Sequence, residues 1–211
     1  MTDVTDRISA VTRTLGTRTR DASEAKVVTL TRIYPSPVED VWDACTSAER
    51  IPRWLMPITG ELRVGGRYQL EGNAGGVIES CDPPRSFGAT WEYGEEMSWI
   101  DVRLDPTGDG TRLTLEHVAH VDAERWAEFG PGAVGIGWDS MLLGLAMHLE
   151  SGAGIDPAEA AAWAASPEGV RFMTESNEAW RAAAVAAGEP AEAAAAAARR
   201  TLAAYTGAPA S

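Results

Sequence analysis

The 211-residue sequence has few basic side chains and few residues of the kind that bind metals. It contains a single lysine, Lys26, together with three histidines and two cysteines. Its 31 acidic residues outnumber its 18 lysine and arginine residues, which gives a formal net charge of −13. A nucleic-acid backbone or an anionic membrane needs clustered positive charge, so this balance argues against either as the main partner. Cys45 and Cys81 belong to no CxxC pair or Cys/His cluster, which favours a reduced cytoplasm and disfavours structural zinc.

Long apolar stretches are also missing. The N-terminal segment has no apolar core of signal-peptide length, and the longest apolar run, residues 133–149, contains Asp139 and several glycines. A membrane-spanning helix needs about 20 predominantly apolar residues. The sequence therefore predicts a cytoplasmic protein without membrane insertion, and its length suffices to bury a core without disulfides.

Residues 26–152 carry strand and helix patterns in turn. β-Branched residues predict a strand at 26–34, and Ser36, Pro37 and Glu39 predict a capping box that starts a helix with an apolar stripe through Cys45. The further elements expected here are a second capping box at Thr46 and Glu49 before a short helix, a hairpin of 61–64 and 67–71 that turns at Gly65-Gly66, and strands at 76–81, 86–93, 97–104 and 111–121.

A long helix should cover one face of this antiparallel sheet, because six apolar or aromatic positions recur at helical spacing. They are Trp138, Met141, Leu142, Leu145, His148 and Leu149. From residue 153 onward 24 of 59 residues are alanine, which predicts helices, with starts at Asp156-Pro157 and Ser166-Pro167. We expect an N-terminal arm at 1–23 that could add a strand, a central domain at 24–152 and a helical extension at 153–211.

This order of elements, with the string SPVEDVWDACTSAERIPRWL, resembles the SRPBCC superfamily, also called START-like or birch-pollen-allergen-like. The branch it resembles contains the homologues of the activator of the heat-shock protein 90 ATPase. The matching positions are Pro37, Val41, Trp42, Trp54, Gly65-Gly66, Tyr68, Asp82-Pro83-Pro84, Trp91 and the run from Leu113 to His117. The resemblance covers residues 24–150. It implies an α+β helix-grip fold, in which a curved antiparallel sheet wraps around a long C-terminal helix and encloses a cavity.

Relatives with that cavity bind lipids, steroids, polyketides or other hydrophobic molecules, and some are cyclases or hydrolases. Strand parity places many aromatic and aliphatic side chains on the face toward the long helix, where they would line a pocket or simply fill the core. Buried Tyr and Trp usually need a polar partner, which a ligand or water can supply. The expected ligand-binding residues are Trp54, Tyr68, Leu70, Trp91, Tyr93, Ile100, Val102, His117, Trp138, Met141, Leu142 and Leu145.

His117 is the sharpest individual candidate. It shares the parity of Leu113 and Leu115, so we expect it to point inward, where imidazole could orient a ligand or act as an acid or base. The alternative is a histidine satisfied by a neighbouring hydroxyl or backbone group. His120 should face the other way, so the pair cannot chelate one metal, and His148 is a weaker candidate.

Residues 130–135 match the GxGxxG pattern of dinucleotide-binding loops. That motif requires a preceding parallel strand, whereas residues 124–129 predict a helical turn, so a flexible glycine-rich segment that gates the cavity is the preferred interpretation. No GxSxG nucleophile motif is present. The position of Cys45 on an apolar stripe predicts an inert, buried thiol.

The sequence thus predicts that the cavity binds a small hydrophobic or amphipathic molecule without cofactor or metal. Two alternatives belong to other classes. One is a polyketide-cyclase- or hydrolase-like enzyme that uses His117 as acid or base. The other is a chaperone-cofactor-like interaction module that acts through its surface and extension. The identity of the ligand and the formation of a homodimer stay open.

Overall fold

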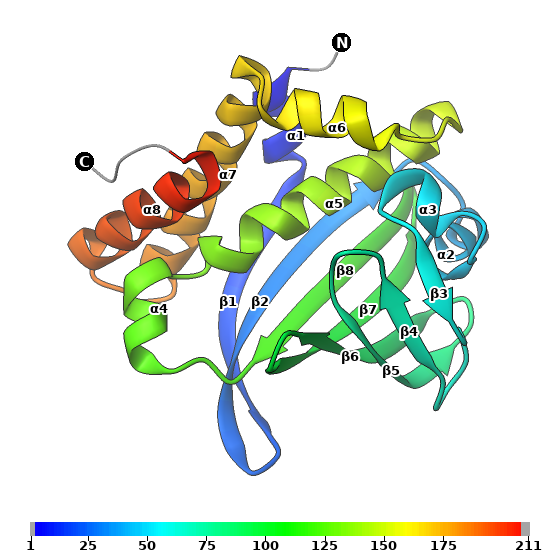
Figure 1. The fold of residues 1–211 in the computed structure, drawn as a ribbon, viewed down its shortest axis with the longest axis horizontal. Coiled ribbons are helices and arrows are strands. Elements are labelled where there is room, and N and C mark those ends of the chain that lie inside the picture. The colour runs from blue at the N-terminus through cyan, green and yellow to red at the C-terminus, as the bar shows by residue number, and fades with distance from the viewer. Residues whose placement is uncertain (1–2, 208–211) are drawn as a thin grey trace. The chain divides into compact units, whose positions relative to one another are not determined.

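An antiparallel sheet of eight strands is the main feature of the computed structural model, which describes residues 3–207 (Figure 1). The strand order is β1-β2-β8-β7-β6-β5-β4-β3. The strands are β1 (Val11–Arg20), β2 (Ser23–Tyr34), β3 (Ile58–Gly60), β4 (Arg67–Leu70), β5 (Gly75–Asp82), β6 (Ser86–Tyr93), β7 (Glu96–Thr107) and β8 (Gly110–Ala119). The helices are α1 (Val4–Ser9), α2 (Val38–Thr46), α3 (Ile51–Trp54), α4 (Ala123–Phe129), α5 (Gly132–Ser151), α6 (Pro157–Ala164), α7 (Pro167–Ala186) and α8 (Ala191–Thr206).

The chain forms two compact units. The first combines the chain up to Leu30 with His120–Ser140 and the chain from Asp156 onward, and the second consists of Thr31–Ala119 and Met141–Ile155. Strand β2 and helix α5 each contribute residues to both units. The boundaries expected near residues 23 and 152, between an N-terminal arm, a central domain and a helical extension, stay a prediction.

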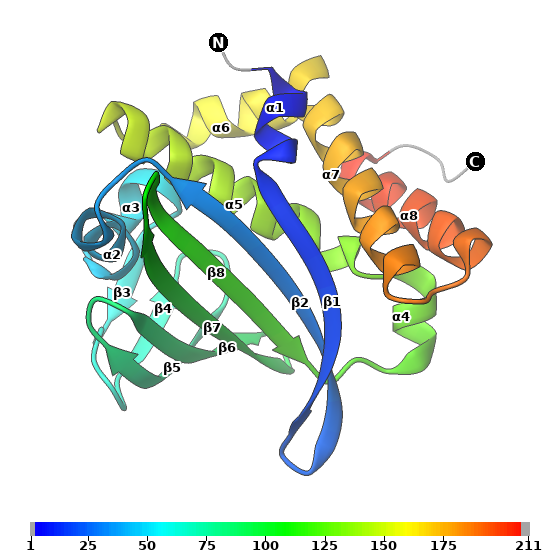
Figure 2. The same cartoon turned by 180° about the vertical axis from the view of Figure 1, so that it is seen from behind.

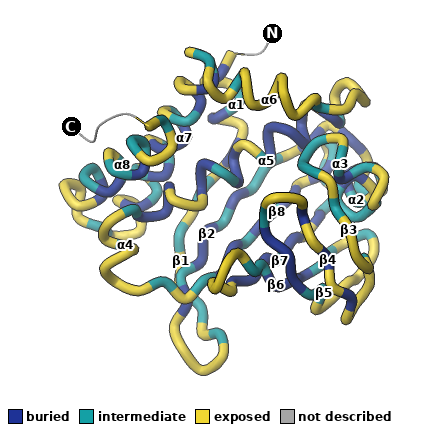
Figure 3. Tube along the Cα trace, viewed as in Figure 1, coloured by how far each residue is buried: buried dark blue, intermediate teal, exposed yellow. Residues whose placement is uncertain are grey.

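The second unit contains the meander that the sequence predicts. Strands β5 to β8 follow one another as antiparallel neighbours (Figure 2), and the last hairpin closes with Thr107 opposite Gly110. Burial alternates along β8, where Thr111, Leu113 and Leu115 are buried and Arg112 is exposed (Figure 3). This period of two means that one face of the sheet is covered and the other is more open.

The expected hairpin at Gly65-Gly66 is only partly correct. Its second strand is β4, but the first is β3, and residues 61–66 form a loop instead of a strand. Gly60 pairs with Tyr68 and has φ +102, and a Cβ on Gly60 would lie 2.1 Å from the Arg67 carbonyl oxygen. The chain therefore leaves the ladder at Gly60, a conformation that suits glycine, and returns only at Arg67.

Both expected capping boxes in this unit are wrong. Helix α2 begins at Val38 after Pro37, and no side chain caps it. Ser36 is instead buried, and its carbonyl accepts a 2.7 Å hydrogen bond from the Thr111 hydroxyl. The Thr46 hydroxyl donates back to the carbonyl of Trp42 inside α2. At the two positions where local sequence predicts caps, Ser36 therefore makes a tertiary contact and the Thr46 hydroxyl bonds back within its own helix.

The first unit is mainly helical, and its helix starts confirm the sequence. Asp156 accepts a hydrogen bond from the Ala158 amide at the start of α6, and Ser166 accepts one from the Gly169 amide at the start of α7. Strand β1 confirms that the N-terminal arm adds a strand. Phe172 and Trp180 of α7 are fully buried. Helix α6 is exposed along almost its whole length (Figure 3).

The glycines of the GxGxxG segment serve helix packing. A Cβ on Gly132 would lie 2.6 Å from Oδ1 of Asn177, and one on Gly135 would lie 2.3 Å from the Trp180 ring. Both glycines lie within α5, which begins at Gly132. Their lack of side chains lets α7 approach α5 closely, and the gating role stays a prediction.

Candidate functional site

The candidate site is the sheet face that carries Leu113, Leu115 and His117 in the second unit. Register pairs Val102 with Leu115 and Ile100 with His117 across β7 and β8. All five side chains are buried. Paired residues of an antiparallel ladder lie on the same face, so they form one continuous apolar surface with a single imidazole in it. We call it the inner face.

The half of α5 that belongs to this unit brings apolar side chains of its own. Leu142 and Leu145 are buried and Met141 is half-buried. The Tyr34 hydroxyl donates a 3.1 Å hydrogen bond to the Leu142 carbonyl. At Gly144 a Cβ would lie 2.5 Å from the Trp54 carbonyl oxygen. Helix α5 is therefore held near β2 and α3 at two points of close approach.

On β4, Tyr68 and Leu70 are both buried, as expected for wall residues. The Tyr68 hydroxyl donates a 2.7 Å hydrogen bond to the Thr90 carbonyl. Burial raises the pKa of the Tyr68 phenol well above its usual range, and the nearby Glu92 carboxylate adds to this. Tyr68 thus keeps its proton and acts as a hydrogen-bond donor.

His117 forms a polar cluster with Ser98 on the inner face. Nε2 of His117 lies 2.8 Å from the Ser98 hydroxyl oxygen, and that hydroxyl donates a 3.0 Å hydrogen bond to the Trp91 carbonyl. Because serine has one hydroxyl hydrogen, Nε2–H of His117 must be the donor to Ser98. Burial lowers the pKa of His117 to about 4, so the ring is neutral at pH 7.

This cluster confirms the alternative in which a neighbouring hydroxyl satisfies an inward histidine. The sequence analysis did not name Ser98. A signal for it exists, because Ser98 has the parity of Ile100 and Val102 and must share their face.

Two aromatic residues expected on the inner face are incompletely covered. Trp91 pairs with Ser98 and is half-buried, and Tyr93 is 62% exposed. Tyr93 keeps the strand parity of Trp91, but it is not covered, and its role as a ligand wall stays a prediction. Tyr93 pairs with Glu96 at the last position before the β6–β7 turn, beyond the covered part of the sheet. The covered face therefore ends close to Trp91.

The two remaining tryptophans among the expected wall residues have other surroundings. Trp54 is half-buried, and its indole N–H donates a 2.9 Å hydrogen bond to the Ala44 carbonyl, which ties α3 to α2. Trp138 is buried in the half of α5 that belongs to the first unit. Their role as ligand walls stays a prediction.

His148 is buried and belongs to a second polar cluster that the sequence analysis missed. Nδ1 lies 2.9 Å from the Ala153 carbonyl and must donate to it, so Nε2 accepts from Arg50, whose nitrogens lie 3.3 and 3.4 Å away. Arg50 also pairs with Asp40 and Asp43. The cluster joins α5 to α2, which makes His148 a structural residue. No local sequence pattern relates residues 98 positions apart.

Two searches of residues 3–207 bear on the class of protein. No group of three or more His, Cys, Asp or Glu side chains in this range could hold a metal ion. In the same range, no helix is both long and apolar enough to cross a membrane.

An antiparallel curved sheet together with a long C-terminal helix defines a protein of the helix-grip class. The chain belongs to the family described as activator of Hsp90 ATPase homolog 1-like proteins, whose model matches residues 35–150, more than half of the chain. Both the fold and the family confirm the resemblance seen in the sequence. A search of curated proteins gave no match.

Several solved structures are similar to the chain. CalU16 from Micromonospora echinospora is 38% identical in its crystal and solution structures. The crystal structure (TM-score 0.67) covers 82% of this chain and 98% of CalU16, and the solution structure (TM-score 0.71) covers 85% and 97%. DynU16, a putative protein in the dynemicin biosynthetic locus, is 18% identical with a TM-score of 0.54, covers 61% of this chain and 48% of DynU16, and shares the fold alone.

The likeness to CalU16 reaches beyond the family domain. Residues 35–150 make up little more than half of the chain, whereas the CalU16 match takes in more than four fifths of it. Part of the chain outside residues 35–150 is therefore shared with that relative.

Proposed function

We propose that the chain binds a small hydrophobic or amphipathic molecule between the inner face and α5, without cofactor or metal. Membership of the family supports this, because its fold typically holds ligands in such a cavity. Ile100, Val102 and Leu115 would form the wall on the sheet side, and Leu142 and Leu145 the wall on the helix side. Apolar walls with a few polar groups are typical of small-molecule sites.

The observation that carries the proposal is the end of the inner face near Trp91. A tryptophan on an otherwise covered face is only half-buried there, and the cluster of His117 and Ser98 lies next to it. An accessible aromatic side chain beside a neutral polar pair suits a ligand with an apolar body and one polar group. His117 and Ser98 would orient that polar group.

The hydrogen bonds at His117 favour binding over acid–base catalysis. A histidine with a pKa of about 4 is a weak base at pH 7, and Ser98 directs its only proton to a backbone carbonyl instead of to the imidazole. An activated nucleophile needs the opposite arrangement, with its proton pointing to the base. We therefore place His117 as an orienting residue.

The interaction-module alternative would use the C-terminal extension as its surface. In the first unit, α7 contacts α1, β1, α6 and α8, and α8 also contacts α4. These contacts bury Phe172, Trp180 and Ala184. The largest apolar side chains of α7 are thus used in internal packing. Deletion after Ser151 would remove the core of a folded unit, so it is no clean test of a partner.

Three finer expectations belong to the same proposal. Neither nucleic acid nor membrane is the partner, because Lys26 and the arginines are outnumbered by acids. A cytoplasmic location fits the free thiols of Cys45 and Cys81. Association into a homodimer stays a prediction for a measurement of mass in solution.

The first test is native mass spectrometry of the protein purified from its own host. We expect a bound molecule that is released by an organic solvent. The matched test fills the site with Val102→Phe, on the inner face, and uses Arg103→Phe as control. Arg103 is the next residue on β7, is exposed, and points to the other face.

Binding of Nile red, a neutral apolar dye, reports on the cavity. With a cavity present, Val102→Phe should abolish dye binding at nearly unchanged stability, and Arg103→Phe should leave both unchanged. If the face is already packed solid, the added ring would cost about 1–3 kcal/mol of stability. A large loss of stability in Val102→Phe, or equal dye binding in both variants, would contradict the proposal.

A further inference from the structure

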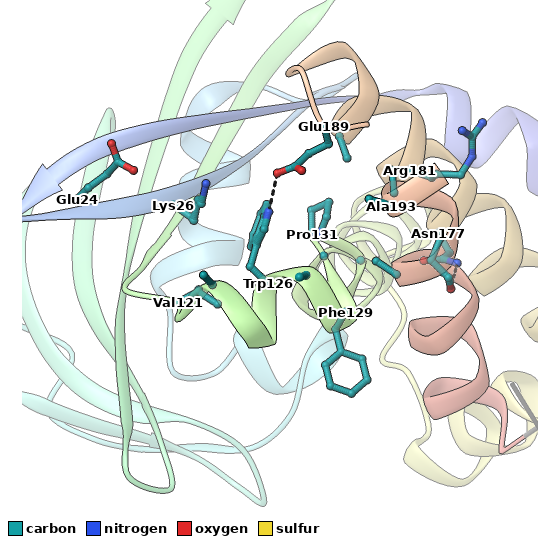
Figure 4. Close-up of a pocket in the computed structure, with 18 residues that line it drawn as sticks. Glu24, Lys26, Val121, Trp126, Phe129, Pro131, Asn177, Arg181, Glu189 and Ala193 are labelled. Atoms are coloured by element: carbon teal, nitrogen blue, oxygen red, sulfur yellow. Dashed lines mark hydrogen bonds between the residues drawn. The ribbon is translucent and has the colours of Figure 1, made fainter. Parts of the chain in front are cut away.

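A pocket of about 450 Å³ lies within the first unit, away from the inner face in sequence and in composition. The start of β2 and helices α4, α7 and α8 supply its lining (Figure 4). Its volume is within the usual range for small-molecule sites. Much of the lining consists of alanines, namely Ala123, Ala127, Ala184, Ala193, Ala194, Ala197 and Ala198. These small side chains form an apolar wall and leave the pocket volume unfilled.

The aromatic ring of Trp126 and the ammonium of Lys26 lie next to each other in the lining of this pocket. The ammonium of Lys26 lies 5.1 Å from the centre of the Trp126 ring, and Figure 4 shows the two side by side. The indole N–H of Trp126 donates a 2.9 Å hydrogen bond to Glu189. Glu189, which precedes α8, thus holds the edge of the Trp126 ring, and the Lys26 ammonium lies over its face.

Lys26 differs from the other cation of the pocket. Arg181 is paired with Glu178 through two nitrogens. Among residues 3–207, no carboxylate lies within ion-pair distance of the Lys26 ammonium. Glu24 lies nearer the start of β2 than Lys26, and Figure 4 shows the two apart. Within residues 3–207 the Lys26 ammonium thus contacts the neutral Trp126 ring and forms no ion pair.

We propose that this pocket binds a small amphipathic anion, a carboxylate with an aliphatic or aromatic body. The carboxylate would pair with Lys26, and the body would cover the alanines. A charge-assisted hydrogen bond is stronger than a neutral one, and its strength grows where water is partly excluded. The site uses none of the residues of the inner face, so it goes beyond the function proposed above.

A cationic ligand fits the same pocket less well, although Glu189 and Glu24 line it. Glu189 already accepts the indole N–H of Trp126. Lys26 occupies a position over the Trp126 ring, where a second cation would be repelled. The charge of the occupant is therefore the point that the experiment must decide.

Lys26 is the only lysine of the chain, which makes it a selective probe. Reductive methylation with ¹³C-formaldehyde labels Lys26 and the terminal amine alone, and it keeps the positive charge. The probes are octanoate, octylammonium and octanol, which share one chain length and differ in charge. We expect octanoate to shift the Lys26 methyl signal in a saturable way. Octylammonium should bind at least about tenfold more weakly, and octanol should lie between them.

Variants then locate the binding by calorimetry with unlabelled protein. Lys26→Gln should weaken octanoate binding by about tenfold, and Lys26→Arg should retain most of it. Ala193→Trp would fill the pocket from an exposed position on α8, and Ala204→Trp, exposed on the same helix but outside the lining, is its control. Circular dichroism checks that each variant folds.

Two crossed measurements separate this site from the inner face. Ala193→Trp should abolish the octanoate response and leave Nile red binding intact, and Val102→Phe should do the reverse. No saturable octanoate shift, octylammonium binding as tight as octanoate, or wild-type octanoate affinity in both Lys26→Gln and Ala193→Trp would each overturn the proposal. Failure of Nile red to bind would contradict only the function proposed for the inner face.

Discussion

Arg13 and Asp139 form a buried ion pair in the first unit. Nε and Nη2 of Arg13 donate to the two carboxylate oxygens of Asp139 at 3.0 and 2.9 Å, and both side chains are at most 5% exposed. The Ser176 hydroxyl and the Trp180 indole N–H donate to the same carboxylate. Four hydrogen bonds compensate the loss of water around a buried charge. One carboxylate thus joins β1, α5 and α7.

Loss of this carboxylate should destabilise the protein strongly. Asp139→Asn leaves the Arg13 guanidinium buried without its counter-charge, and removal of one partner of such a pair costs about 3–5 kcal/mol. Urea denaturation followed by tryptophan fluorescence measures the change in the free energy of unfolding. The control is Glu178→Gln, which breaks the more exposed pair with Arg181 and should cost less than about 1 kcal/mol. Similar costs for the two variants would contradict the role assigned to Asp139.

Two glycines of α5 should respond in opposite ways to the same substitution. A Cβ on Gly135 would collide with the Trp180 ring, so Gly135→Ala should destabilise the protein by about 1–3 kcal/mol. A Cβ on Gly137 would meet only the Tyr205 hydroxyl at 3.6 Å, an ordinary contact. Gly137→Ala should be neutral or stabilise by up to about 1 kcal/mol through helix propensity. Melting temperatures of the two variants give the comparison, and equal shifts would refute the packing account.

The buried His117 predicts a specific dependence of stability on pH. Its folded pKa of about 4 lies below the value of about 6.5 for an unfolded histidine. Between these values the unfolded chain binds a proton that the folded chain does not. The contribution of His117 is therefore fully present above pH 6.5 and falls as pH is lowered toward 4, by up to about 3 kcal/mol.

His117→Gln isolates this effect, since the variant keeps all other titrating groups. The difference in free energy of unfolding between wild type and variant should be constant above pH 7 and should change between pH 6.5 and 4. Urea titrations at a series of pH values measure it. A difference that is flat across this window would show that folding does not lower the pKa of His117.

The two cysteines should differ sharply in reactivity. Burial raises the pKa of the Cys45 thiol to about 12, and Cys81 is exposed. Because the thiolate is the reactive form, an aromatic disulfide reagent at pH 8 should modify one thiol per native chain quickly and the second only after denaturation. Cys81→Ser should remove the fast phase. Two fast thiols, or a fast phase that survives this substitution, would contradict the burial of Cys45.

Elements with strong local signals were predictable from the sequence. Alternating residues predict the strands from 75 to 119, and the Asp156 and Ser166 caps predict two helices, because side-chain periodicity and capping act within a few residues. The boundaries that failed are those that distant contacts decide. The carbonyl of Ser36 accepts from Thr111, and β3 ends at Gly60, where the nearby Arg67 carbonyl leaves no room for a side chain.

The candidate site likewise has features that the sequence predicts and features that only distant contacts decide. Strand parity correctly places Ile100, Val102 and His117 on one face, but it cannot show where the cover over that face ends, and Tyr93 lies beyond that end. Ser98 was within reach of the same parity argument. The pocket at Lys26 was not, because its walls come from segments as far apart as residues 26 and 198.

The shortage of basic residues noted first in the sequence acquires its meaning in the fold. Composition and periodicity by themselves determined an acidic protein with an antiparallel sheet, one apolar face and a covering helix, because these properties depend on residue type and local spacing, and the resemblance to a known family implied the helix-grip fold. Only the tertiary structure decided which charges are used inside. It buries Arg13 against Asp139, neutralises His117, and leaves Lys26 over an indole ring, because burial and partner distance, which set the energy of a charge, arise only when remote segments meet.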